Sequence, residues 1–276
     1  MKVLVIGGTH GNEWTGIIAV RKYAESFKQK FPRVQMEFIH ANPDAYTINR
    51  RFKDEDLNRA FQNLQDPRPH SYEYVRALEL KKIIQAEPCF VIDLHTTTSN
   101  MGATVIISHY NSVNFGVASK LSNELSDCRV IGSPDPKRKY LVSQSDFGLM
   151  IEVGPVANGT IEPKALEKTL AVLEIVLKTI EENHFSRNGE LEIYEEIQDF
   201  SYPTDSSGEL SAYIHPDFQG KDFVPVNGAY SPFKSFNGEE LNFQTSENLY
   251  PIFINEAAYY PSKHAFTLCR KKRLRF

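Results

Sequence analysis

The N-terminal stretch MKVLVIGGTHGNE, residues 1–13, decides the class of fold. Its apolar run, Val3–Ile6, ends at Gly7-Gly8, so the stretch lacks both the long apolar core and the cleavage site of a signal peptide. A short apolar run that stops at a glycine turn predicts a buried first strand. Apolar residues at near-helical spacing follow within Trp14–Phe27. We therefore expect the chain to begin with a strand, a turn and a helix.

Strand-like and helix-like segments alternate through the first two-thirds of the chain. Further strands are predicted over Val34–His40, Cys89–Leu94, Thr104–Ile107 and Leu149–Val153. Further helices are predicted over Tyr72–Gln85, Phe115–Leu125 and Lys164–Ile180. Such alternation indicates βαβ units, and hence an α/β fold with a mainly parallel sheet flanked by helices.

The pattern changes near residues 184–189. Period-two stretches such as Glu190–Ile197 and Leu210–Ile214 follow, separated by turn-forming pairs such as Asn227-Gly228. No helix is expected in this part. We therefore predict a larger domain over residues 1–186 and a smaller C-terminal β domain over residues 187–276.

The composition of the chain argues against nucleic acid and membranes as partners. The chain has 276 residues, and its net charge of −4 argues against a nucleic-acid partner, which needs a basic face. No run reaches the ~18 apolar residues of a transmembrane helix, so no membrane association is expected. The widely spaced cysteines, Cys89, Cys128 and Cys269, are expected to be reduced thiols in a cytoplasmic protein. No interface pattern stands out, which leaves open whether copies of the chain form a homo-oligomer.

Residues that can bind a metal or transfer a proton follow or end three predicted strands. His10, His95 and Glu152 are expected near one another, because ligands of open α/β sheets bind beyond the carboxyl ends of the strands. Glu13 follows His10 by three residues, so that both can share a cation. Two histidines and a glutamate are a usual ligand set of catalytic zinc, and Asp93 is placed to orient His95. Isolated HxxE sequences also occur without metal, so these residues alone leave both interpretations open.

The charged segment NRRFKDEDLNR, residues 49–59, also has two interpretations. It is either a solvated loop or a clamp for a carboxylate, since a guanidinium binds a carboxylate through two parallel hydrogen bonds. In the second case Asn58 would add a donor, and Arg51 would face the oxyanion formed during amide hydrolysis.

Six segments spread over the chain resemble the aspartoacylase/succinylglutamate desuccinylase family. They are GGTHGNEWTG (7–16), DEDLNRAF (54–61), DLHTTTSNMG (93–102), IEVGP (151–155), YPTDSSGELSAYIHP (202–216) and YPIFINEAAYYPSKHAF (250–266). The family is similar in fold and zinc site to the zinc carboxypeptidases, which implies a mixed sheet. The resemblance also implies that the C-terminal β region caps the site and excludes large peptides, with Glu256 as a structural support.

The resemblance implies a zinc amidohydrolase with one zinc ion per chain. His10, Glu13 and His95 would be the zinc ligands, and Glu152 would be first the general base and then the general acid. The substrate would be a small N-acyl amino acid. N-acetyl-L-aspartate, cleaved by water to acetate and L-aspartate, is the expected case.

The resemblance also implies residues that hold the substrate. Arg51 would bind the scissile carbonyl and stabilise its oxyanion, while Asn58 and Arg59 would bind the α-carboxylate. Tyr259 and Tyr140 would reach into the pocket.

One departure from the family bears on specificity. Family members that prefer N-acetylaspartate resemble each other in carrying an arginine for the side-chain carboxylate, and residues 141–150 contain none. Two interpretations stay open for Lys137, Arg138, Lys139 and Lys263: one of them replaces this arginine, or they belong to a solvated basic loop. Asp146 would repel an acidic substrate if it faced the pocket. N-acetylated aromatic or sulfur-containing amino acids and N-succinyl amino acids are therefore also candidate substrates. Two further hypotheses are a non-catalytic zinc-binding protein and a peptide-cleaving carboxypeptidase.

Overall fold

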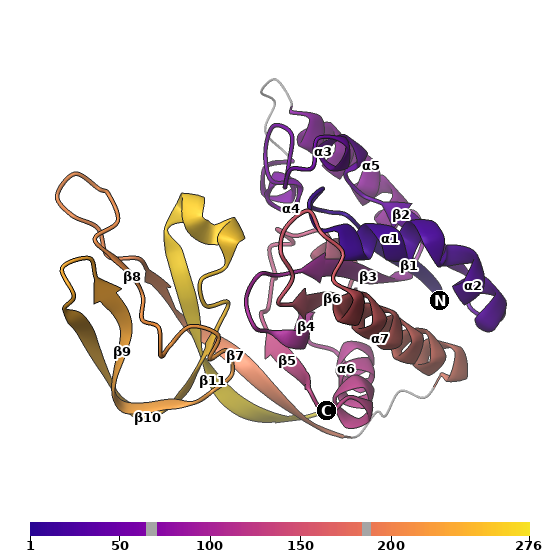
Figure 1. The fold of residues 1–276 in the computed structure, drawn as a ribbon. Helices are drawn as coiled ribbons and strands as arrows, with labels where there is room; N and C mark the ends of the chain where they lie inside the picture. Colours follow the sequence, from indigo (N-terminus) through magenta and orange to yellow (C-terminus); the bar gives the residue numbers. More distant parts are fainter. Residues whose placement is uncertain (65–70, 184–188) are drawn as a thin grey trace.

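One eleven-stranded sheet runs through both parts of the molecule (Figure 1). The computed structural model describes residues 1–64, 71–183 and 189–276. The strand order is β2-β1-β3-β6-β4-β5-β7-β11-β10-β9-β8. None of the helices in these ranges combines the length and the apolar character needed to cross a membrane.

The N-terminal half of the sheet is mixed and mainly parallel, as the sequence predicted. β1 (Lys2–Gly7) lies between β2 (Met36–His40) and β3 (Cys89–Thr96), and β3 pairs with β6 (Phe147–Gly154), all in parallel. β4 (Gly102–Ile107) runs antiparallel to β6 and parallel to β5 (Cys128–Gly132). The carboxyl ends of β1, β3 and β6 therefore meet at one edge, where His10, His95 and Glu152 are expected.

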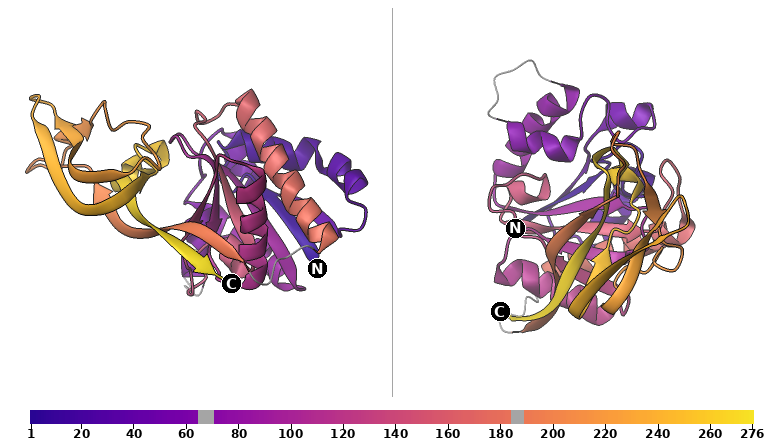
Figure 2. Two further views of the ribbon diagram at one scale, coloured as in Figure 1. Left: turned by 90° about the horizontal axis from the view of Figure 1, so that it is seen from below. Right: turned by 90° about the vertical axis from the view of Figure 1, so that its left-hand side faces the viewer.

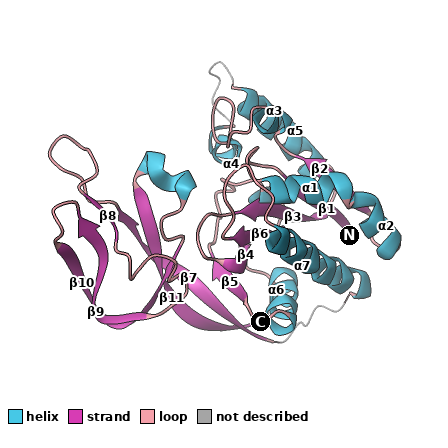
Figure 3. Cartoon of the chain, viewed as in Figure 1, coloured by secondary structure: helices cyan, strands magenta, loops and turns pink. Residues whose placement is uncertain are grey.

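Helices cover both faces of this half of the sheet (Figures 1 and 3). Side chains of β1 alternate between the faces: Val3 and Val5 pack in one core cluster, and Leu4 and Ile6 in another. The first cluster includes residues of α1 (Trp14–Lys22), α2 (Ala24–Lys30), α6 (Ser112–Glu124) and α7 (Pro163–Glu182). The second includes residues of α4 (Leu57–Ala60) and α5 (Tyr72–Gln85), close to α3 (Pro43–Thr47).

The C-terminal part is mostly antiparallel sheet (Figure 2). Its strands are β7 (Glu190–Ser201), β8 (Ala212–Ile214), β9 (Val226–Ser235), β10 (Glu240–Ile252) and β11 (His264–Arg275). β7 joins the two halves, because Ile131 and Gly132 of β5 pair in parallel with Tyr194 and Glu195. The predicted boundary between residues 186 and 187 lies outside the described residues, so the two-domain division stays a prediction.

Two local expectations are corrected. The helix predicted over Trp14–Phe27 is two helices, α1 and α2, which break at Tyr23 (φ −110°, ψ −3°). The β region, where no helix was expected, contains the short 3-10 helix η3 (Ala257–Ser262). Glu256 starts η3 by accepting a hydrogen bond from the Ala258 amide, and Lys263 ends it with a positive φ of 56°.

Candidate active site

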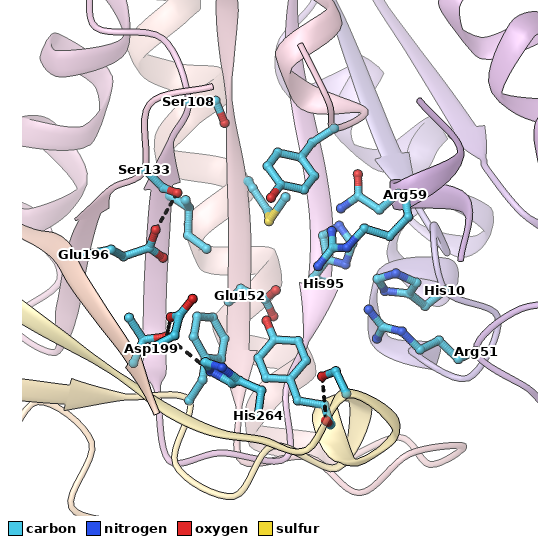
Figure 4. A pocket seen from close by; sticks show the side chains of 18 of the residues that line it. His10, Arg51, Arg59, His95, Ser108, Ser133, Glu152, Glu196, Asp199 and His264 are labelled. Carbon is cyan, nitrogen blue, oxygen red and sulfur yellow. Dashed lines mark hydrogen bonds between the residues drawn. The ribbon is translucent and has the colours of Figure 1, made fainter. Parts of the chain in front are cut away.

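A cavity of about 550 Å³ lies between the carboxyl edge of the sheet and the C-terminal β region (Figure 4). This volume is within the ~300–1,000 Å³ range of small-molecule sites. Its lining includes all but one of the residues expected at the site: His10, Arg51, Asn58, Arg59, His95, Tyr140, Glu152 and Tyr259. Glu13, the remaining one, lies behind the two histidines and touches both.

The turn after β1 brings His10 and Glu13 together. The Glu13 amide donates to the His10 carbonyl at 3.2 Å, which closes a tight turn just before α1. Gly8 has a positive φ of 74°, which strongly favours glycine. A Cβ on Gly11 would lie 2.2 Å from the backbone of Ala45 and Tyr46, so only glycine fits there. The glycines of GGTHGNE therefore allow the close packing that holds the two ligand candidates.

Glu13, His10 and His95 form a buried cluster that could hold a metal ion. The Glu13 carboxylate lies 2.6 Å from His10 Nδ1 and 2.9 Å from His95 Nδ1. One ligand atom from each residue lies within 4.8 Å of the others. Two imidazole nitrogens and one carboxylate that converge in this way match the protein ligands of catalytic zinc, so the residues present fit that ion.

The other nitrogen of each imidazole faces a carboxylate. His95 Nε2 lies 2.8 Å from Asp93 Oδ2, which confirms that Asp93 contacts His95, and His10 Nε2 lies 3.2 Å from Asp56 Oδ1. Metal-binding histidines usually have such a partner, because it fixes the ring and its tautomer. Burial lowers the pKa of His95, but Asp93 and Glu13 outweigh this and raise the pKa well above its ordinary value. A proton and a metal cation can substitute for each other here, since each supplies the positive charge that the carboxylates favour.

Glu152 lies beside this cluster on the neighbouring strand, in register with His95. Its Oε2 atom is buried and has no hydrogen-bond partner among the described residues. Burial raises the pKa of Glu152 to about 8, and His95 opposes the shift. A carboxyl group with such a pKa can both accept and release a proton near neutral pH.

Three residues of the charged segment 49–59, namely Arg51, Asn58 and Arg59, line the cavity. The Arg51 guanidinium lies 3.2 Å from Glu13 Oε1 and 3.0 Å from Asp56 Oδ2, so it is held at the metal cluster. Asn58 is buried in α4 and its Oδ1 accepts from the Leu141 amide at 2.9 Å. The Arg59 guanidinium carbon lies 5.1 Å from the centroid of the Tyr140 ring, a cation–π contact at the cavity wall. Arg51, Asn58 and Arg59 therefore form one wall of the cavity, while the residues between Arg51 and Glu55 are exposed.

Glu73 of α5 positions this wall, and its role was not expected from the sequence. Its fully buried carboxylate accepts from the backbone amides of Lys53 (2.7 Å), Asp54 (3.0 Å) and Glu55 (3.3 Å). Asn42 Nδ2 donates to it as well, at 3.1 Å. No sequence signal marks Glu73, because a glutamate in the first turn of a helix is ordinary.

Glu256 connects the C-terminal part to the loop after His95. Its Oε2 accepts from the amides of Thr98 (2.7 Å) and Ser99 (3.3 Å), and it also contacts the Thr97 hydroxyl. This loop directly follows β3, so Glu256 holds the end of the strand that carries a ligand candidate. The geometry agrees with the supporting role expected for Glu256.

The cations suggested as substitutes for a missing arginine lie elsewhere. Arg138 pairs with Asp146, and Lys263 Nζ donates to the Gly208 carbonyl. Among the described lining residues there is no lysine, and the arginines are Arg51 and Arg59. Asp146 does not line the cavity either.

Comparisons with known proteins show the family of this chain. The model of the succinylglutamate desuccinylase/aspartoacylase catalytic domain matches residues 1–180. The chain belongs to this family. The AstE/AspA barrel-sandwich hybrid domain of the same family matches residues 189–271.

Relatives in the family align along the whole chain. A probable aspartoacylase of Trichodesmium erythraeum is 33% identical over 99% of this chain and 98% of its own length. An N-acyl-aromatic-L-amino acid amidohydrolase of Xenopus laevis is 29% identical over 98% of this chain and 94% of its own. The crystal structure of murine aminoacylase 3 superposes with a TM-score of 0.91 at 30% identity, covering 100% of this chain and 96% of the other.

Proposed function

We propose that this chain is a zinc-dependent amidohydrolase that removes the acyl group from N-acyl amino acids. One observation carries the proposal: the His10, Glu13 and His95 cluster shares its cavity with Glu152, whose Oε2 has no hydrogen-bond partner in the described ranges. Membership of the family and the names of the relatives support the same reaction.

Each group has a part in the mechanism. His10, Glu13 and His95 would hold the zinc ion, which when bound would supply a Lewis acid to activate water and polarise the scissile carbonyl. Glu152 takes a proton from the attacking water at its free Oε2 and then donates that proton to the leaving amine. Arg51 lies beside Glu13 and donates hydrogen bonds to the carbonyl oxygen as negative charge develops there.

Arg59 and Asn58 bind the α-carboxylate of the substrate. Arg59 is held against the Tyr140 ring, which limits its rotamers and orders the guanidinium for a carboxylate. Tyr259 lines the same cavity, and burial and the nearby Glu152 charge raise the pKa of its hydroxyl. The hydroxyl therefore stays protonated and serves as a hydrogen-bond donor to the substrate.

N-acetyl-L-aspartate stays the first substrate suggested by the family, and N-acyl aromatic amino acids the second. A panel of N-acetyl and N-succinyl amino acids, assayed for release of the free amine, tests the reaction. We expect activity that a chelator removes and zinc restores. Activity that persists after complete removal of metal would contradict zinc dependence. Bound zinc without turnover of any panel member would favour a non-catalytic zinc-binding protein.

A further inference from the structure

The end of the cavity away from the metal cluster is acidic. Figure 4 shows Glu196 and Asp199 on one side of Glu152, and His95, His10, Arg51 and Arg59 on the other. Both carboxylates come from β7, and β11 beside it contributes His264 and Thr267 to the same wall. This end of the cavity, called here the acidic wall, is defined by Glu196 and Asp199.

A β-bulge explains why both carboxylates face the cavity. Residues three apart on a regular strand point to opposite faces. Here Leu268 pairs with Gln198 but Cys269 pairs with Glu196, so Ile197 is an extra residue on β7. A bulge of this kind shifts the alternation by one residue, which turns Glu196 to the same side as Asp199.

The charge of the acidic wall is not neutralised within the described residues. Ser133 Oγ donates to Glu196 Oε2 at 2.7 Å, and Thr267 Oγ1 donates to Asp199 Oδ1 at 2.7 Å. Neither carboxylate forms an ion pair with a described lysine or arginine. Burial lowers the pKa of His264, so this neighbour adds no positive charge at neutral pH. Desolvation by its surroundings raises the pKa of Glu196, the Ser133 hydrogen bond opposes the shift, and the Asp199 charge adds to it.

The two ends of the cavity therefore select different charges. Arg59 and Asn58 fit a carboxylate at one end, and Glu152, whose buried Oε2 has no hydrogen-bond partner among the described residues, lies between the two ends (Figure 4). An acidic group at the acidic wall would be repelled by two like charges. A neutral aromatic group would remove water from the carboxylates without offering them a partner. A cation at that end would form ion pairs with both carboxylates.

We propose that the acidic wall binds a cationic amino-acid side chain, so that the preferred substrates are Nα-acyl derivatives of lysine, ornithine or arginine. This inference rests on the proposed deacylase function. With the α-carboxylate at Arg59 and the scissile carbonyl at Arg51, the side chain is the large substituent that remains to occupy the far end. N-acetyl-L-aspartate is then a poor substrate, because its side-chain carboxylate would face Glu196 and Asp199.

A matched pair of substrates tests this charge selection. Nα-acetyl-L-lysine and N-acetyl-L-norleucine have the same aliphatic chain and differ in the terminal ammonium. We expect a kcat/KM at least tenfold higher for the lysine derivative, and a preference that shrinks as salt is added, because salt screens charges in an open cavity. N-acetyl-L-aspartate should be turned over more slowly than both.

Substitutions at the wall complete the test. The double variant E196Q/D199N keeps acceptors for Ser133 and Thr267, and it should lower kcat/KM for the lysine derivative to the norleucine level while norleucine turnover stays within about twofold. The single variants E196Q and D199N should each lose part of the preference for the lysine derivative. They therefore still test the inference if the double variant does not fold. The control is E195Q, because Glu195 is the neighbouring residue on β7 and does not line the cavity.

The outcomes separate two failures. Equal or better turnover of the norleucine, phenylalanine or aspartate derivative by the wild type overturns the inference but leaves the deacylase function standing. A lysine preference that survives both substitutions also overturns it. No turnover of any N-acyl amino acid contradicts the proposed function itself.

Discussion

Glu73 offers a sharp test of how the substrate wall is held, because it acts without touching the cavity. The substitution Glu73→Gln exchanges one carboxylate oxygen for an amide group of nearly the same shape. One oxygen of Glu73 accepts from Asn42 and Lys53, and the other from the amides of Asp54 and Glu55. Glutamine can serve only one of these pairs, so two donors lose their acceptor.

The expected cost follows from that count. Leaving a buried donor unsatisfied costs about 1–3 kcal/mol, so two donors cost roughly 2–6 kcal/mol. Lys53 and Asp54 are exposed residues, and water can reach part of this segment. We therefore expect the free energy of unfolding to fall by about 2–3 kcal/mol. Because residues 53–55 lead into Asp56, Asn58 and Arg59, we also expect KM to rise about tenfold, which corresponds to ~1.4 kcal/mol of binding.

Urea unfolding followed by circular dichroism measures the first effect, and steady-state kinetics the second. Glu79→Gln is the matched control, since Glu79 lies on the same helix in an exposed pair with Arg76, and such pairs contribute less than ~1 kcal/mol. Bound zinc should be unchanged in both variants, because the ligand candidates lie outside this segment. If Glu73→Gln matches the control in both stability and KM, the carboxylate does not hold the wall.

Three further predictions concern other residues. Glu152→Gln should lower kcat by roughly 10²–10⁴-fold with zinc content unchanged, and unaltered turnover would remove its role in proton transfer. Arg59→Ala should mainly raise KM, whereas a tenfold fall in kcat with KM intact would place Arg59 at the reacting atoms. Burial raises the pKa of Asp222 to about 6, so the folded protein retains a proton that the unfolded chain releases near pH ~3.9. Its contribution to stability is therefore present below pH ~4 and is lost as the pH rises through about 6. The stability difference between wild type and Asp222→Asn, measured in urea, should shift by about 2–3 kcal/mol between pH 4 and 7, and a constant difference would refute this.

The sequence predicted best where local pattern and long-range packing agree. The helix predicted over Tyr72–Gln85 has those bounds in the structure, because Ser71 caps it and its apolar residues face the sheet. The antiparallel direction of β4 carried no local signal, since pairing direction depends on the path of the connecting chain. Tyr23 likewise breaks a helical pattern without a glycine or proline to mark the break.

Some residues of the candidate site could be predicted from the sequence, and others could not. His10, His95 and Glu152 could be placed together because they follow or lie near the ends of strands that meet at one edge of the sheet, and Glu13 follows His10 by three residues. The acidic wall could not be predicted, because it depends on the partner strand β11 and on an irregularity in its pairing. Side chains brought together by long-range pairing leave no periodic trace in the sequence.

The bulge at Ile197 makes the charge of the cavity depend on the number of residues in a strand. If Ile197 paired with Cys269 in place of Glu196, the alternation on β7 would be regular and Glu196 would turn out of the cavity, although no charged residue would have changed. A relative could therefore keep the same glutamate and yet accept different substrates, if one more residue on the partner strand β11 removed the bulge. In this family, single-residue insertions and deletions in the strands shared by the two halves can change specificity as much as substitutions do.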